Sequence, residues 1–178
     1  LTGFATHSHS NMEILTYVLA GEVSHKDSMG NITKIKAGEF QLMSAGKGIS
    51  HSEMNSHPTQ TLHLMQIWLV PAEQNTEPRY QQMQFADSQQ VALIASPVEQ
   101  EGSMHIKQDA AIYRLKFKQG EQIRLTSDRT YGYFHLIDGQ GAINEVALTT
   151  GDALISKDES DLVFTALSDG QALWFDLS

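Results

Sequence analysis

The sequence predicts an all-β protein made of two similar antiparallel β units. Runs rich in β-branched and aromatic residues dominate, from residues 14–19 near the beginning to residues 172–177 at the end. Turn signals separate these runs at roughly the eight-to-twelve-residue spacing of a β-sandwich or barrel. No stretch shows the periodicity of a long amphipathic helix.

In the first half, we expect strands at residues 14–19, 40–43 and 61–70, the last of which is closed by Pro71. Turns are expected at residues 27–31 and 36–39, and a glycine-rich loop at residues 45–48. Residues 72–92 change character, because they are polar and irregular and show no strand pattern. They therefore read as the beginning of a connection.

In the second half, the strand pattern resumes at residues 112–117, 132–137, 153–155, 162–166 and 172–177. Glycines beside acidic residues space these strands and echo Gly21-Glu22 and Gly38-Glu39 of the first half: Gly120-Glu121, Asp138-Gly139 and Gly151-Asp152. The sequence predicts an N-terminal β domain over residues 1–82, a connecting segment over residues 83–110 and a C-terminal β domain over residues 111–178.

The composition excludes several classes of function. The 178 residues fit one large β domain or two small ones. A net charge of −9 argues against binding to nucleic acid or to anionic lipid. No apolar run is long enough to span a membrane. The absence of cysteine excludes disulfides and thiolate metal ligands, so we expect a cytoplasmic protein. Because the chain begins with Leu directly before its first motif, we expect N-terminal sequence to be missing.

Two short motifs each place metal-binding side chains two residues apart, His7-x-His9 and His51-x-Glu53. Residues i and i+2 of a β-strand point to the same face. Two such strands side by side would therefore aim all four side chains at one point. Three imidazoles and a carboxylate suit a divalent metal, and the ligand types fit iron, manganese, cobalt, nickel or zinc.

The residues around these two pairs resemble motifs of a known superfamily. The first stretch is similar to the first cupin motif, Gly3…His7-x-His9-x-x-x-Glu13…Gly21. The second is similar to the second cupin motif, Gly38…Gly46…His51-x-x-x-Asn55. Within the cupins, the chain most resembles pirin-like bicupins of the bacterial quercetin 2,3-dioxygenase type, through His25-x-Asp27, Gln41-x-Met43-x-Ala45-Gly46, Leu64-x-Gln66-x-Trp68 and Pro78-x-Tyr80-Gln81. This resemblance covers most of residues 3–82 and is only architectural after about residue 110.

The resemblance implies a bicupin, two packed antiparallel β-barrels of the jelly-roll type, with one metal ion in the N-terminal barrel. The implied ligands are His7, His9, His51 and Glu53, and Fe(II) is the expected metal. Pirin-like proteins carry several tens of residues before the first motif, so we expect the N-terminal barrel to be incomplete in this chain. The second half has neither His-x-His nor His-x-Glu, so its barrel is expected to bind no metal.

Other polar residues near the motifs receive less specific predictions. Glu13 is read as a hydrogen-bond partner of a metal-binding imidazole, with metal ligand and pocket base as alternatives. His25 is expected in a surface turn and His57 in an exposed loop. His63 lies in the predicted strand 61–70 and is expected to be buried and hydrogen-bonded.

The resemblance implies an oxidoreductase, a metal-dependent dioxygenase that cleaves flavonols such as quercetin with O2. Glu53 is then the expected catalytic residue, because it would take the proton of the flavonol hydroxyl. The alternative is a non-enzymatic metal-binding regulator that tunes a protein partner. A metal-dependent isomerase or hydrolase is the third hypothesis, because cupins host many chemistries. The sequence has neither a phosphate-binding loop nor a Gly-x-Ser-x-Gly nucleophile motif.

Overall fold

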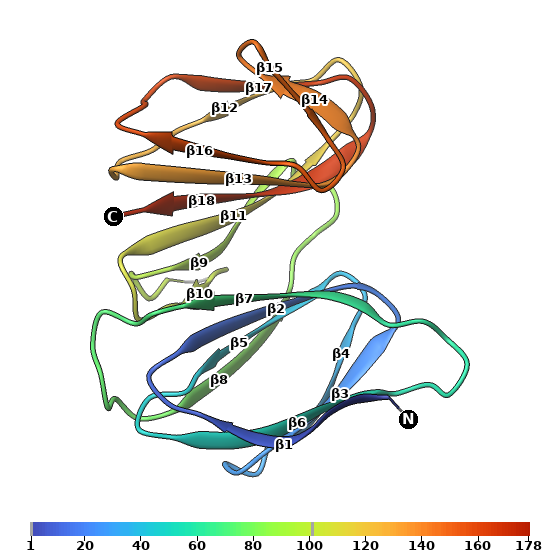
Figure 1. Cartoon of the computed structure of the whole chain (residues 1–178), viewed down its shortest axis with the longest axis vertical. Helices are drawn as coiled ribbons and strands as arrows, with labels where there is room; N and C mark the ends of the chain where they lie inside the picture. The colour runs from blue at the N-terminus through green and yellow to red at the C-terminus, as the bar shows by residue number, and fades with distance from the viewer. Residues whose placement is uncertain (1, 101) are drawn as a thin grey trace. The chain divides into compact units, whose positions relative to one another are not determined.

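A computed structural model describes residues 2–100 and 102–178 of the chain (Figure 1). These residues form eighteen β-strands and no helix, which confirms the predicted all-β class. Within the same residues, no helix is therefore long and apolar enough to cross a membrane.

The chain forms two compact units. The first contains the residues up to Phe85 together with Val98–Gln100 and Met104–Gln108, and the second contains Ala86–Pro97 and Asp109–Ser178. Residues 83–110, expected as a connecting segment, are thus divided between the units. Their strand β9 (Val91–Ser96) belongs to the second unit and their short strand β10 (Met104–His105) to the first. The domain limits 82 and 111 stay a prediction.

The first unit consists of two four-stranded antiparallel sheets (Figure 1). Sheet A has the strand order β1 (Gly3–His9), β6 (Ile49–Asn55), β3 (Glu22–Asp27) and β4 (Ile32–Lys36). Sheet B has the order β7 (His63–Leu69), β2 (Glu13–Ala20), β5 (Glu39–Ser44) and β8 (Arg79–Gln84).

The interior between sheets A and B is apolar at both ends and polar in the middle. At one end, Ile14 of β2 packs with Ile49 of β6. At the other end, Val18 of β2 packs with Val23 of β3. Thr16 lies between Ile14 and Val18 on the same face of β2, since alternate residues of a strand share a face. Its neighbours in register are polar too, Gln41 on β5 and Gln66 on β7.

This polar layer explains a strand that the sequence pattern does not reveal. Residues 72–92 were expected to be irregular, but β8 lies within them. Gln82 of β8 pairs with Gln41, so its side chain joins the polar face, and Tyr80 shares that face two residues earlier. A strand with a polar inner face has no apolar alternation, and the prediction was therefore wrong here.

The second unit also contains two antiparallel sheets. One has the order β12 (Gln122–Leu125), β17 (Leu162–Ala166), β14 (Gln140–Ile143) and β15 (Val146–Thr149). In the other, the strands of this unit follow the order β9, β11 (Ala110–Phe117), β18 (Gly170–Leu177), β13 (Tyr131–Asp138) and β16 (Ala153–Lys157).

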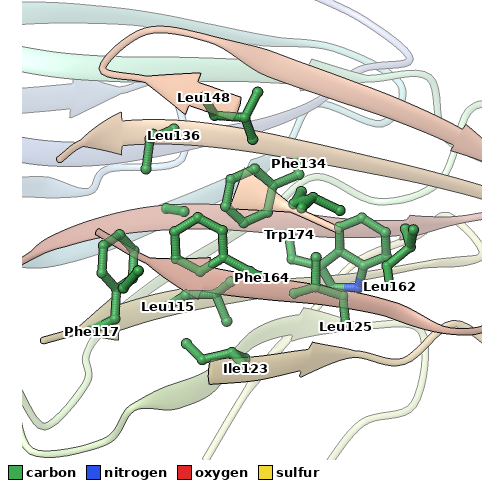
Figure 2. Close-up of a cluster of buried hydrophobic side chains, with 13 residues drawn as sticks. Leu115, Phe117, Ile123, Leu125, Phe134, Leu136, Leu148, Leu162, Phe164 and Trp174 are labelled. Atoms are coloured by element: carbon green, nitrogen blue, oxygen red, sulfur yellow. The ribbon is translucent and has the colours of Figure 1, made fainter. Parts of the chain in front are cut away.

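Thirteen buried apolar residues fill the second unit (Figure 2). Phe164 lies at their centre, and its ring centroid is 4.7 Å from that of Phe117 and 5.0 Å from that of Phe134. The core of this unit is therefore apolar throughout and has aromatic rings at its centre, whereas the first unit has a polar centre.

We expect Phe164→Ala to lower the free energy of unfolding by about 3–5 kcal/mol, because it leaves a cavity in this aromatic cluster. Urea unfolding followed by circular dichroism measures the change. Val146→Ala, at an exposed position of β15, is the control and should stay within about 0.5 kcal/mol. A Phe164→Ala effect as small as that of Val146→Ala would show that the cluster does not stabilise the unit.

The glycine-acidic echo between the two halves corresponds to a repeated turn. In each of three turns, a glycine with φ between 84° and 90° precedes a carboxylate, and that carboxylate accepts a hydrogen bond from the backbone N–H three residues earlier. These bonds are 2.8–2.9 Å long and join Lys36 to Glu39, Lys118 to Glu121 and Thr149 to Asp152. Positive φ favours glycine, and the carboxylate satisfies a backbone donor that the turn leaves free.

Candidate metal centre

Strands β1, β6 and β3 lie side by side in sheet A and bring five polar side chains to one place. His7 on β1 is opposite His51 on β6, and His51 is opposite Asp27 on β3. Two residues further along β6, Glu53 is opposite His25 of β3. All of these side chains share one face, because paired residues and residues two apart point the same way.

These side chains form two groups of possible metal ligands. One group is His7, His9 and His51, and the other is His25, His51 and Glu53. Within each group, one ligand atom per residue lies within 4.8 Å of the others. The three rings of the first group have centroids 4.5–5.1 Å apart. His51 belongs to both groups, and Glu53 joins the group of His25. The four-residue ligand set expected from the sequence stays a prediction.

Several nitrogen and oxygen atoms in these groups are buried without a hydrogen bond. His51 is 1% exposed and Glu53 is 2% exposed. Among the described residues, no partner is found for either ring nitrogen of His51, for Nε2 of His9 or for Oε1 of Glu53. Buried polar atoms are normally paired, so a cluster of unpaired electron-pair donors fits a bound cation.

His7 has the orientation that a ligand needs. Its Nδ1 lies 2.8 Å from the carbonyl oxygen of Ala5, so Nδ1 carries the proton and donates it there. Nε2 then keeps its lone pair free. Metal-binding histidines typically use one nitrogen for the metal and the other for such a hydrogen bond.

Burial keeps two of the imidazoles, those of His9 and His51, neutral. Desolvation, followed by the nearby His7 and His25, lowers the pKa of His51 to about 4. Desolvation also lowers the pKa of His9. Both rings are therefore uncharged at neutral pH, the form that binds a metal. Burial raises the pKa of Glu53, against the hydrogen bond from Gln66, which lowers it.

A chain of hydrogen bonds fixes the carboxylate of Glu53. Nε2 of Gln66 donates to Oε2 of Glu53 over 2.8 Å. Oε1 of the same Gln66 accepts a 3.1 Å hydrogen bond from the indole Nε1 of Trp68. One oxygen of the Glu53 carboxylate is thus held by β7, while the other, Oε1, is left for a metal or a proton.

His25 is buried at the site, so its expected place in a surface turn was wrong. Its Nε2 lies 3.2 Å from Oδ2 of Asp27, and its Nδ1 lies 3.5 Å from Nε2 of Gln41. Asp27 also accepts hydrogen bonds from Asn31, which lower the pKa of its carboxyl. His25-x-Asp27 has the same i, i+2 spacing as the two ligand motifs, and this was the signal that could have placed it inside.

Glu13 does not point to the histidines. Its side chain points to the other face of β2 from that of Thr16, because the two residues are three positions apart in the strand. Its Oε2 accepts hydrogen bonds from Oγ of Ser44 and from the backbone N–H of Lys107. Burial raises the pKa of this carboxyl. The three readings of Glu13 as a ligand, an imidazole partner or a pocket base were therefore wrong.

Two further histidines are exposed. His57 lies on the surface, as expected. His63 was expected to be buried but is exposed, because it forms the first residue of β7, beyond an irregularity in the pairing of β7 with β2. Neither of them belongs to the two groups of possible ligands.

We expect a chelator to lower the melting temperature of the metal-loaded protein by about 5–10 °C. A ligand bound only by the folded state stabilises it by about 2.7 kcal/mol at a hundred times its Kd, and about 1 kcal/mol changes the melting temperature by about 2–4 °C at this size. Thermal unfolding with and without EDTA measures the change.

The double variant His7→Ala/His9→Ala should show almost no shift with EDTA. The matched control His57→Ala/His63→Ala, at two exposed histidines, should keep the full shift. Equal shifts in the two double variants would contradict a metal at His7 and His9.

Comparisons with known proteins identify the family and the fold of the chain. The Pirin family matches residues 1–69, and the family described as "Quercetinase C-terminal cupin domain" matches residues 93–177. The chain is 45% identical over 177 residues to "Quercetin 2,3-dioxygenase" of Escherichia coli K12. This match covers 98% of the chain and 76% of that relative. It is 35% identical to "Pirin-like protein" of Caulobacter vibrioides, over 98% of the chain and 77% of the relative.

A solved structure extends the similarity to the fold. The E. coli bacterial pirin YhhW in complex with nickel(II) superposes with a TM-score of 0.93 at 44% identity. The match covers 98% of this chain and 76% of that protein. Both units of the chain therefore have the cupin fold that the motifs predict.

Proposed function

Because this chain belongs to the pirin family of bicupins, we propose that it is a metal-dependent dioxygenase that cleaves flavonols such as quercetin with O2. The cluster of buried, unpaired nitrogen and oxygen atoms at His9, His51 and Glu53 is the observation that carries this proposal. The relatives named quercetin 2,3-dioxygenase support the substrate class.

We propose that one divalent metal is held by His7, His9, His51 and Glu53, and that this metal is Fe(II). Neutral imidazoles and a carboxylate equally accept nickel, manganese, cobalt or zinc, and a nickel(II) complex is known for the YhhW relative. A bound divalent ion would supply a positive charge that lowers the pKa of the flavonol 3-hydroxyl group.

In this proposal, Glu53 has two successive roles: it helps to hold the metal, and it acts as the general base once the incoming flavonol has released it from the metal. Its Oε1 is free of hydrogen bonds, whereas Gln66 holds Oε2 in place. Desolvation raises the pKa of this carboxyl, so the group accepts a proton more readily than an exposed glutamate does. Glu53 would take the proton of the flavonol 3-hydroxyl group. The resulting flavonolate is electron-rich and would then react with O2.

Two measurements on the same sample test the proposal. Elemental analysis should find one divalent metal per chain, and an oxygen electrode should record O2 consumption when quercetin is added. Loss of both after treatment with a chelator, and recovery with Fe(II), is the expected pattern. A metal-loaded protein that consumes no O2 with quercetin would overturn it.

That negative outcome would favour a metal-binding regulator of a protein partner. The net charge of −9 is the observation in favour of this alternative, because an acidic surface suits a basic protein. Relatives named only as pirin-like proteins are consistent with either function.

A further inference from the structure

We propose that Trp68 and Phe4 form an aromatic clamp that binds the flat ring system of the substrate beside the metal centre. This inference rests on the proposed function, because it names the side chains that would recognise a flavonol. It assigns a role to two exposed aromatic rings, neither of which is itself a candidate metal ligand.

Each ring lies next to one imidazole of the site, Trp68 next to His9 and Phe4 next to His7. The ring centroid of Trp68 is 5.0 Å from that of His9, with an interplanar angle of 84°. The ring centroid of Phe4 is 6.3 Å from that of His7, with an angle of 65°. Trp68 belongs to β7 and Phe4 to β1, and these are the edge strands of sheets B and A.

The pairing of the strands places both side chains on inner faces. Trp68 is opposite Ile14, which packs between the two sheets. Phe4 is opposite Glu53, which belongs to the candidate metal centre. The two rings therefore approach the same group of histidines, one from each sheet.

Both rings remain available to a ligand. Trp68 is 52% exposed and Phe4 is 57% exposed. Single exposed apolar residues are common on protein surfaces and need no explanation. Two large aromatic rings beside adjacent imidazoles are a different case, because apolar walls around a few polar groups are typical of small-molecule sites.

The orientation of Trp68 is fixed before any ligand binds. Its indole Nε1 donates to Gln66, and Gln66 in turn donates to Glu53. The edge of the indole is thus tied to the carboxylate, while much of its surface stays open. A side chain that is already ordered loses less entropy on binding, so it strengthens binding more than a mobile one would.

The chemistry of the clamp selects a planar aromatic ligand. Indole and phenyl rings gain most from an offset or edge-to-face contact with another π system. A ligand held there would bring the hydroxyl groups on its edge next to the candidate metal centre, because the two rings lie beside His7 and His9. A flat polyphenol meets both requirements, whereas an aliphatic polyol offers no ring for Trp68 and Phe4.

The test is calorimetric titration of the metal-loaded protein with quercetin in the absence of O2, so that binding is measured without turnover. We expect Trp68→Ala to weaken quercetin binding about tenfold and Phe4→Ala several-fold, as for the loss of an aromatic contact. Trp68→Phe keeps a ring and should recover part of the affinity. Ile32→Ala removes an exposed apolar side chain from β4 and should bind quercetin like the wild type.

Elemental analysis of each variant supplies a readout besides affinity. Metal content should remain at the wild-type level in Phe4→Ala and Ile32→Ala. Trp68→Ala and Trp68→Phe both lose the hydrogen bond that orients Gln66, so their affinity for quercetin is measured on protein that has been shown to carry one metal per chain. Trp68→Ala that retains both its metal and wild-type affinity would overturn the clamp, as would a wild-type protein that binds no quercetin. Wild-type protein that binds quercetin through Trp68 but consumes no O2 would support the clamp and overturn the dioxygenase. The two proposals can therefore fail separately.

Discussion

Replacing His51 by alanine is expected to remove almost all of the bound metal. His51 is the residue shared by the His7/His9/His51 and the His25/His51/Glu53 groups, so its loss breaks both. Variants that only disturb the orientation of a ligand weaken metal binding by about 10–100-fold. Loss of a ligand itself should exceed this. Elemental analysis after dialysis measures the remaining metal.

The matched control is His57→Ala, which removes an exposed histidine of the same unit and should leave metal content unchanged. His51→Ala that retains full metal would show that neither group is the site. Because the variant also removes a buried side chain, circular dichroism must first show that the fold is kept. His51→Gln, which better preserves the volume, provides a second variant for the same measurement.

Two further single variants separate the two groups. If the ligands are those expected from the sequence, His7→Ala should lose metal strongly. His25→Ala should lose less, because His25 would then act through its contacts with Asp27 and Gln41. The reverse order would move the metal to the His25 group and would contradict the proposed role of His7 and His9.

The sequence predicted best those features that depend on local periodicity. Residues 162–166 were expected as a strand and form β17, and residues 14–19 lie within β2. Both runs are rich in β-branched and aromatic residues, so the strand pattern is visible without any neighbour. The i, i+2 spacing likewise indicated that His7 and His9 share a face with each other, as His51 and Glu53 do.

The wrong predictions for residues 72–92, His25 and Glu13 required knowledge of which face is inside, whereas His63 is exposed because it lies at the irregular start of β7. His25 was placed at the surface because a histidine beside Lys26 and Asp27 looks like a turn, yet the pairing of β3 with β6 buries it. Glu13 was predicted to lie at the metal site, but side chains alternate along β2 and that of Glu13 points away from the histidines. Inward residues are usually apolar, but in a polar interior this rule does not identify the inner face of a strand. Only the pairing of the strands in the folded structure shows which residues point inward.

Glu53→Gln is expected to keep the metal site while lowering the turnover of quercetin by about 10²–10⁴-fold, the contribution typical of a general base. Glutamine has nearly the same size as glutamate, and its single amide oxygen can either face the metal or accept the hydrogen bond from Gln66, while the three histidines continue to hold the ion. It cannot take a proton at neutral pH. The loss should therefore fall on kcat rather than on the affinity for quercetin, because ring contacts at Trp68 and Phe4 are untouched.

Oxygen consumption at saturating quercetin measures kcat, and anaerobic titration measures affinity in the same preparation. The control is Gln60→Glu, which changes an exposed side chain and should leave both quantities unchanged. Metal-loaded Glu53→Gln with wild-type turnover would remove Glu53 as the base. Glu13 could not replace it, since its carboxylate lies on the other face of β2 and is bound to Ser44 and Lys107. Among the residues that the structure describes, Asp27 is the other buried carboxylate on the histidine side, where it pairs with His25, and Asp27→Asn would be the next variant to measure.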